Sequence, residues 1–273
     1  MDSALHAAMG PRPGAAIVVD IASGNVMAQH RLDIAASRLA APGSAIKPFT
    51  LLALLHSGRF DPLNRVQCRR QLTVAGHRMD CTHPESPLPL DAADALAYSC
   101  NSYFAAAVSL LSQTDLRHEF EKAGLISDTG LAAHEAIGRM SRPGSREQLQ
   151  LQALGASGIE VTPLALVRAY RLLALQRKNN RDPALKIVYQ GLEASTTYGM
   201  AHAARPDSYA VAGKTGTASS LTSPLTHGWF VGYAPAQDPK IVLLVYLEHG
   251  HGMDAAMIAH TVFTAYRDAE GKH

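Results

Sequence analysis

Residues 42–58 read PGSAIKPFTLLALLHSG, a small turn followed by a strongly apolar helix that Gly58 ends. Leucines and a phenylalanine occupy nearly every side of the helix predicted at 44–57, so we expect it to be buried and central. Ser44 and Lys47 are three residues apart at its start, which places a hydroxyl and an amine on one helical face. A lysine whose pKa is lowered by burial can activate a serine hydroxyl, although Ser-x-x-Lys also occurs in many exposed helical turns.

Ser99 and Asn101 interrupt the next helical pattern. Residues 91–98 and 102–111 each have the apolar spacing of a helix, and the two polar residues fall between them. Side chains at such a break can project from a loop into a site. Helix capping would explain the same residue types by local hydrogen bonding, and the spacing alone leaves both interpretations open.

Lys214 lies in an apolar strand pattern, residues 209–218, and is followed by Thr215, Gly216 and Thr217. A glycine within a strand indicates close approach by another backbone or by a ligand. In that case the lysine supplies a cation for an anionic substrate group. An edge-strand lysine that discourages aggregation is the alternative.

Strand patterns lie at both ends of the chain, with helical patterns between them. The predicted strands are 15–20, 26–29, 209–218, 228–234 and 240–247, and further helices are predicted at 115–124, 163–176 and 254–268. We therefore expect an α/β (α+β) fold in which about five antiparallel strands are flanked by the last helix and the Ser44 helix. Residues 61–90 lack sustained periodicity and predict an excursion of loops and short strands.

The predicted domain organisation follows from this order of elements. Residues 1–14 form an N-terminal extension, and residues 15–273 form one domain. Within it, a sheet subdomain (15–40 and 205–273) holds an inserted, mostly helical subdomain (about 41–204).

The composition is that of an ordinary globular protein. Of 273 residues, 47% are hydrophobic and 18% are charged, with a formal net charge of +2 and no basic stripe, so we expect no nucleic-acid partner. No apolar run reaches the roughly eighteen residues of a membrane span, and residues 1–14 lack the basic start and apolar stretch of a signal peptide. We therefore expect neither a membrane anchor nor an export signal in this sequence.

The three polar elements occur in the order Ser-x-x-Lys, Ser-x-Asn and Lys-Thr-Gly, which resembles the penicillin-binding proteins and the related serine β-lactamases. Longer stretches are similar to that family as well: residues 42–49, 98–104, 155–164 and 227–235. The resemblance extends from about residue 15 to the end of the chain. It implies a penicillin-binding transpeptidase domain that uses no cofactor and no catalytic metal.

The resemblance also implies a role for each motif residue. Ser44 attacks the carbonyl carbon of a D-alanyl-D-alanine stem peptide of peptidoglycan, or of a β-lactam, with Lys47 as general base. Ser99 relays a proton to the leaving nitrogen. Asn101 holds the substrate amide and Lys47, and Lys214 keeps the site positive.

The strand that carries the third motif is implied to bind substrate. Thr215 and Thr217 bind the terminal carboxylate, with Gly216 between them, and the backbone N–H groups of Ser44 and Thr217 form the oxyanion hole. Peptidoglycan stem peptides are the implied substrate and β-lactams the covalent inhibitors, with a membrane-anchored or cell-wall synthesis protein as a further partner. The family's substrate implies an extracytoplasmic location, which contrasts with the expected lack of an export signal.

Several activities share these motifs. A class A β-lactamase also needs a glutamate that activates the deacylating water. We expect exposed helix or loop positions for the glutamates between the second and third motifs: Glu119, Glu121, Glu135, Glu147, Glu160 and Glu193. A long-lived acyl-enzyme is therefore expected, which favours a D,D-transpeptidase. A D,D-carboxypeptidase, a β-lactamase, an esterase of the same fold and a non-catalytic β-lactam-binding sensor are the alternatives.

The three cysteines allow more than one arrangement. Cys68, His77, Cys81 and His83 have donor atoms for zinc, but their spacing matches no standard zinc finger. A Cys68–Cys81 disulfide is a second possibility, and unlinked structural residues are the leading expectation. Cys100, beside the second motif, is interpreted as a packed thiol.

Overall fold

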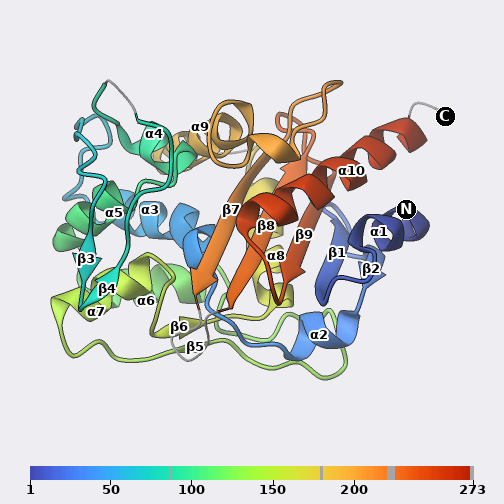
Figure 1. Cartoon of the computed structure of the whole chain (residues 1–273), viewed down its shortest axis with the longest axis horizontal. Coiled ribbons are helices and arrows are strands. Elements are labelled where there is room, and N and C mark those ends of the chain that lie inside the picture. Colours follow the sequence, from blue (N-terminus) through green and yellow to red (C-terminus); the bar gives the residue numbers. More distant parts are fainter. Residues whose placement is uncertain (86–87, 179–180, 220–224, 271–273) are drawn as a thin grey trace.

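The computed structural model of the chain describes residues 1–85, 88–178, 181–219 and 225–270. Its main sheet has five antiparallel strands in the order β2-β1-β9-β8-β7 (Figure 1). They are β1 (Gly14–Asp20), β2 (Val26–His30), β7 (Ala212–Ser219), β8 (Thr226–Ala234) and β9 (Ile241–Leu247). The predicted antiparallel sheet, assembled from the two ends of the chain, is confirmed. Residues 86–87 of the predicted excursion and 271–273 of the predicted domain lie outside the described residues.

Strand β9 is buried along its whole length because both faces of the sheet are covered. Its sequence, IVLLVYL, has apolar or aromatic side chains at consecutive positions rather than at alternate ones. Helix α10 (Gly252–Glu270) covers one face, where Phe263 packs against Phe230 of β8. Helix α8 (Pro163–Leu175) covers the other face and contacts β1, β8 and β9 (Figure 1).

The expectation that the Ser44 helix flanks the sheet is wrong in part. The Ser44 segment meets the sheet mainly through a 3-10 turn, η1 (Gly43–Ile46), packed against the edge strand β7. The helix that follows, α3 (Lys47–His56), packs among α4 (Ala92–Ala97), α6 (Gln113–Lys122) and α9 (Pro183–Thr197). It is buried from Lys47 to Leu54, which confirms its central position. An apolar surface on all sides is satisfied by helices as well as by a sheet, so hydropathy alone does not choose between them.

Between β2 and β7 the chain is mostly helical. The remaining helices are α2 (Leu32–Ser37), α5 (Asn101–Ala107), η2 (Val108–Leu110), α7 (Arg146–Ala153) and η3 (His202–Ala204). Two short ladders pair β3 (Thr73–Val74) with β4 (His77–Arg78), and β5 (Arg139–Met140) with β6 (Ile159–Glu160). The first ladder belongs to the predicted excursion, whose described residues contain no longer strand and no helix.

The N-terminal extension contains a helix that the sequence does not predict. Helix α1 (Asp2–Met9) packs on β2 and α10, and its Leu5 and Met9 are buried in the core that lies under α10. The N-terminus therefore lies beside the last helix, on the same face of the sheet (Figure 1).

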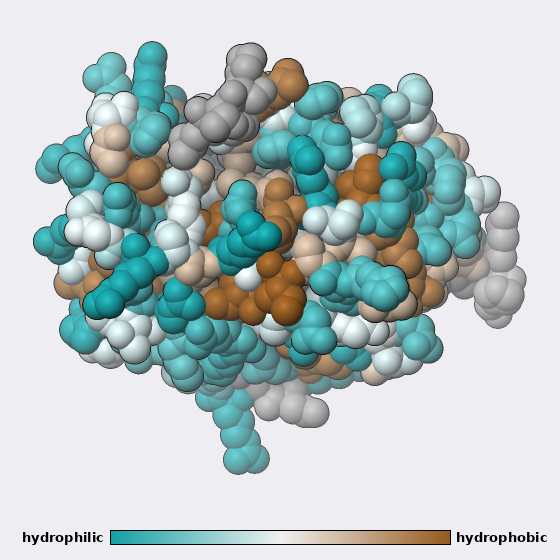
Figure 2. All heavy atoms as spheres, turned by 90° about the horizontal axis from the view of Figure 1, so that it is seen from below, coloured by the Kyte–Doolittle hydropathy of each residue, from teal (hydrophilic) through white to brown (hydrophobic). Residues whose placement is uncertain are grey.

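One face of the molecule is mostly polar. Seen from below the orientation of Figure 1, hydrophilic residues cover most of the face and hydrophobic residues gather near its middle (Figure 2). Such a mixture is ordinary for a protein surface in water. Among the described residues, no helix combines the length and apolar character that crossing a bilayer requires.

Candidate active site

Ser44, Ser99, Asn101, Thr215 and Thr217 line one cavity of about 350 Å³. They come from three distant parts of the chain: the turn η1, the loop after α4 together with the first residue of α5, and the edge strand β7. Folding therefore brings the three sequence motifs to a single site.

Ser44 lies where this turn is pressed against strand β7. Gly43 has a φ of +53°, in the left-handed region that glycine adopts most readily, and a Cβ there would lie 2.6 Å from the Thr217 carbonyl oxygen. A Cβ on Gly216 would lie 2.5 Å from the carbonyl oxygen of Pro42. The close backbone approach that Gly216 predicts is therefore confirmed. It brings the Ser44 turn against the strand that carries the third motif.

Lys47 is fully buried at the start of α3. Its Nζ atom donates to the Ser99 carbonyl oxygen at 2.7 Å, to Asn101 Oδ1 at 2.6 Å and to Ser99 Oγ at 3.4 Å. The same atom lies 5.2 Å from the centre of the Phe104 ring. Burial lowers the pKa of Lys47 to about 8, because removal from water disfavours the charged amine. An amine with this pKa is partly neutral at physiological pH and can accept a proton.

Ser99 has an unusual backbone conformation. Its φ is +57°, in the left-handed region that residues other than glycine rarely adopt, and such strain is concentrated at functional sites. The N–H groups of Ser99 and Cys100 donate to the carbonyl oxygens of Leu96 and Ala95, which tie the loop to the end of α4. Cys100 occupies the N-cap of α5. The capping interpretation therefore does not account for Ser99 and Asn101.

Asn101 connects the lysine to the excursion. Its Oδ1 atom accepts from Lys47, while its Nδ2 atom donates to the carbonyl oxygens of Met79 at 3.0 Å and Asp80 at 3.4 Å. The excursion thus forms one wall of the cavity, through His77, Arg78, Met79, Asp80 and Thr82. This wall is not predictable from the sequence, because residues 61–90 lack a periodic pattern and no local signal indicates where such a segment packs.

Lys214 points into the protein although β7 is an edge strand. It is fully buried, and its Nζ atom donates to the Thr215 carbonyl oxygen at 3.1 Å. Burial, together with the charge of Lys47, lowers the pKa of Lys214 well below its usual range. A lysine that discourages edge pairing is exposed to solvent, so that alternative is wrong.

The two threonines of the third motif face the cavity from β7. Thr217 is exposed, and its hydroxyl oxygen accepts the N–H of Gly252, the first residue of α10, at 2.9 Å. Thr215 is mostly buried, and its hydroxyl donates to the Met200 carbonyl oxygen over a long distance of 3.4 Å. Both threonines are among the residues that line the site.

In the described part of the chain, no glutamate lines this cavity. Most of the glutamates between the second and third motifs are exposed or partly exposed. Glu119 differs: it is 5% exposed, and its carboxylate lies 2.9 Å from Nδ1 of His56. The expected exposed position is therefore wrong for Glu119, because the buried carboxylate finds a partner on α3.

Known proteins resemble this chain in sequence and in structure. Residues 14–266 match the family described as the penicillin binding protein transpeptidase domain. The probable peptidoglycan D,D-transpeptidase PenA of Neisseria flavescens is 24% identical over 298 residues, which cover 92% of this chain and 73% of that protein. The peptidoglycan D,D-transpeptidase MrdA of Acinetobacter baumannii is 24% identical over 278 residues, which cover 81% of this chain and only 41% of that protein.

Solved structures agree with the sequence match. The crystal structure of a peptidoglycan glycosyltransferase from Burkholderia ambifaria superposes with a TM-score of 0.84 at 23% identity, covering 98% of this chain and 94% of that one. The similarity includes the five-stranded sheet and its flanking helices. Because the family match runs from β1 into α10, this chain belongs to the penicillin-binding protein transpeptidase domain family.

Proposed function

We propose that the chain is a D,D-transpeptidase that cross-links peptidoglycan through an acyl-enzyme on Ser44. One arrangement carries the proposal: Lys47 contacts both Ser99 and Asn101 at the cavity that Ser44 lines. The relatives PenA and MrdA are named as peptidoglycan D,D-transpeptidases, which supports D-alanyl-D-alanine stem peptides as the substrate class. β-Lactams are the corresponding covalent inhibitors, since they offer an acyl group to the same serine.

In the proposed acylation, neutral Lys47 takes the proton from Ser44 Oγ, and this oxygen attacks the carbonyl carbon of the terminal D-alanyl-D-alanine bond. The backbone N–H groups of Ser44 and Thr217 stabilise the oxyanion, each by roughly 3–4 kcal/mol in comparable hydrolases. The hydroxyl of Ser99 passes a proton from Lys47 to the leaving nitrogen. The C–N bond then breaks, D-alanine departs and Ser44 is left as an ester. An acceptor amine attacks this ester by the reverse sequence.

The third motif binds the substrate carboxylate in this proposal. Lys214 keeps the region positive, and the hydroxyl groups of Thr215 and Thr217 donate to the carboxylate across Gly216. The 3.4 Å bond from Thr215 to Met200 is weak, so little free energy is lost when that hydroxyl turns toward the substrate.

The ester is expected to be long-lived toward water. The described lining of the cavity contains no glutamate that could activate a deacylating water, which supports transfer to an acceptor amine over rapid hydrolysis of β-lactams. The carboxypeptidase differs from the proposed enzyme only in using water as the acceptor, so it is the alternative that shares most of the mechanism.

We also propose the domain organisation and the location. Residues 15–273 form the catalytic domain, with a sheet subdomain (15–40 and 205–273) and a helical subdomain (about 41–204). Residues 1–14 are an extension that packs on it through α1. Because peptidoglycan lies outside the cytoplasmic membrane, the proposed site of action is extracytoplasmic, with a membrane-anchored or cell-wall synthesis protein as a further partner.

Labelling with a fluorescent penicillin tests the nucleophile. The wild-type chain should form a stable adduct, Ser44→Ala should form none, and Ser109→Ala should label like the wild type because Ser109 is an exposed serine outside the cavity. Intact-mass analysis should show an adduct that persists. Its rapid disappearance would favour a β-lactamase, and absence of labelling in the wild type would contradict the proposal.

Incubation with a stem pentapeptide and an acceptor amine tests the reaction. Mass spectrometry should detect the cross-linked product together with released D-alanine. Release of D-alanine without cross-linked product would favour the carboxypeptidase. Penicillin labelling with neither product would favour the sensor.

A further inference from the structure

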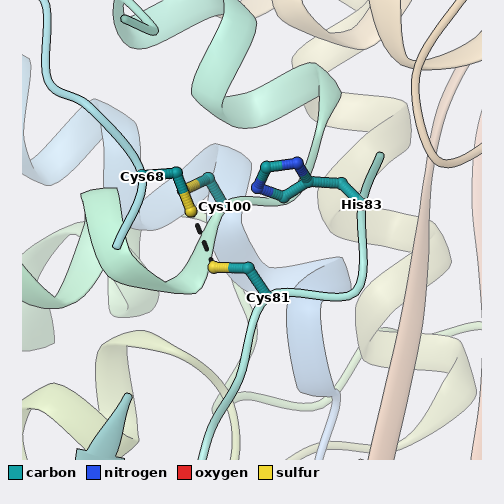
Figure 3. Close-up of side chains that lie close together, drawn as sticks. All are labelled: Cys68, Cys81, His83 and Cys100. Carbon is teal, nitrogen blue, oxygen red and sulfur yellow. Dashed lines mark hydrogen bonds between the residues drawn. The ribbon is translucent and has the colours of Figure 1, made fainter. Parts of the chain in front are cut away.

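Cys68, Cys81, His83 and Cys100 bring four metal-binding side chains together next to the active site. One donor atom from each lies within 4.8 Å of the donor atoms of all the others. The first three belong to the excursion, and Cys100 belongs to the loop between α4 and α5 (Figure 3). Cys68 is partly exposed and the other three are buried. The set differs from the one that sequence spacing offered, because His77 lines the Ser44 cavity and Cys100 takes its place.

The sulfur atoms of Cys81 and Cys100 are spaced for a metal ion and not for a disulfide. All three cysteines are free, and the Sγ atoms of Cys81 and Cys100 are 3.8 Å apart. A disulfide bond needs about 2.05 Å, so Cys81 and Cys100 are not linked, and because Cys68 and Cys81 are both free the predicted alternative of a Cys68–Cys81 disulfide is wrong. Two thiolates on a tetrahedral zinc ion, each about 2.3 Å from it, lie about 3.8 Å from one another. The observed separation therefore suits zinc.

His83 offers one ring nitrogen to the sulfur atoms and uses the other for a hydrogen bond. Its Nδ1 atom lies 2.7 Å from the Pro84 carbonyl oxygen, which places the proton on Nδ1. Its Nε2 atom points toward the cysteines (Figure 3), is buried and has no hydrogen-bond partner among the described residues. A buried nitrogen without a partner destabilises the fold, and a bond to a metal would satisfy it. Zinc-bound histidines divide their two nitrogens in the same way.

Each sulfur atom also accepts a backbone N–H group. The donors are Arg70 to Cys68 at 3.3 Å, Ser102 to Cys81 at 3.3 Å and Tyr103 to Cys100 at 3.5 Å. Such donors stabilise a negative sulfur, and the thiolate is the form of cysteine that binds metals. Both the four ligands and the backbone N–H groups around them therefore favour metal binding.

We propose that these four residues bind one Zn²⁺ ion in a structural site. Three cysteines and one histidine complete a tetrahedral shell, which leaves no coordination position for water or substrate. The site would hold the excursion against the active-site loop. The described excursion has little structure of its own, namely a two-residue hairpin and an isolated bridge between Val66 and Leu90, and a bound metal supplies the missing stability.

The position of Cys100 connects this site to the cavity. It lies between Ser99 and Asn101, and Asn101 itself donates to the excursion at Met79. A bound metal would therefore hold together the excursion and the segment around Cys100, which are the two segments that the hydrogen bond from Asn101 to Met79 joins. The proposal stands on the ligand geometry and does not depend on which reaction the chain catalyses.

Metal analysis of the full chain tests the proposal. Protein purified under reducing conditions from zinc-supplemented culture should contain about one zinc ion per chain by mass spectrometry. Replacement by Co²⁺ should give the absorption bands of a tetrahedral thiolate complex. Cys68→Ser and Cys81→Ser should lose the metal, whereas the matched variant His77→Gln should keep it, because His77 is outside the cluster.

Two results would overturn the proposal. One is wild-type protein that neither carries zinc nor gives the Co²⁺ bands; the other is unchanged metal content in Cys68→Ser and Cys81→Ser. If those variants fail to fold, the zinc content and the Co²⁺ bands of the wild-type protein still decide the question. Zinc removal by a chelator should lower its thermal midpoint and speed amide exchange in residues 66–83, and added zinc should reverse both. Penicillin labelling is scored separately, so failure of the proposed function is distinguishable from absence of the metal.

Discussion

Raising the pH from 7 to 9 should increase the rate at which Ser44 is acylated by about tenfold. The proposed base, Lys47, acts in its neutral form, and its pKa is lowered to about 8 by burial. The neutral fraction is then about one eleventh at pH 7 and about ten elevenths at pH 9. The rate should therefore rise through pH 8 and level off above pH 9. A lysine with the ordinary pKa of about 10.5 would instead give a nearly hundredfold rise over the same interval and no plateau.

The measurement is the second-order rate constant for acylation by a fluorescent penicillin, followed by stopped flow between pH 6 and 10. Circular dichroism at each pH would confirm that the chain stays folded. Lys47→Arg is the control, because a guanidinium remains protonated throughout this range and should support little acylation at any pH. A flat profile, or a rise that continues unbroken to pH 10, would refute a buried Lys47 as the base.

Three further predictions concern the structure around the site. Asn101→Ala removes the 2.6 Å bond to the buried ammonium group and should slow acylation at least tenfold, with a loss of about 1–3 kcal/mol in the free energy of unfolding by urea titration. Gly216→Ala would put a Cβ 2.5 Å from the Pro42 carbonyl oxygen and should abolish labelling, whereas Gly144→Ala, with no contact closer than 3.4 Å, should label normally; equal labelling would contradict the close packing. Burial lowers the pKa of His56, but its hydrogen bonds to two carboxylates raise the pKa more, so the net shift is upward. The ion pairs of protonated His56 therefore stabilise the fold at low pH, and this stabilisation is lost as the pH rises through the raised pKa. The difference in thermal midpoint between wild type and His56→Gln should thus be larger at pH 6 than at pH 8.5, and a constant difference would count against the ion pairs.

The sheet, and the last helix that covers one of its faces, could be predicted from the sequence, but the helix that covers the other face could not. Strand β9 stands out because an unbroken apolar run of this length, bounded by turn residues, is typical of a strand buried on both faces. Helices α3 and α8 are both strongly apolar, and hydropathy does not say which of two buried helices meets the sheet. Helix α9 is missed because Asp182 and Pro183, which begin it, are residue types that are also found where a helix stops, and the sequence pattern assigns them to the end of the preceding helix.

Site residues that are close in the sequence could be predicted, whereas contacts between distant segments could not. Ser44 and Lys47 are predictable as a pair because a spacing of three residues is a helical contact. The cysteine cluster is not predictable from spacing, because Cys100 lies in a different segment from the other ligands and joins them only through the path of the excursion. The Asn101 contact with a backbone carbonyl of the excursion is hidden for the same reason: a main-chain acceptor leaves no mark in the sequence.

The two buried lysines explain why the cavity needs walls from all three parts of the chain. Burying an ammonium group costs free energy, and placing two of them near one another adds repulsion. For Lys47 this cost is offset by the Ser99 carbonyl oxygen and Asn101 Oδ1, and Asn101 is held in turn by the excursion. If that wall moved away, water would reach Lys47, and its pKa would return toward the ordinary value. The amine would then be almost entirely protonated at neutral pH and unable to act as a base. The lowered pKa is therefore a property of the closed cavity as a whole, and the excursion, which contributes no motif residue, is as necessary to it as the helix on which Lys47 lies.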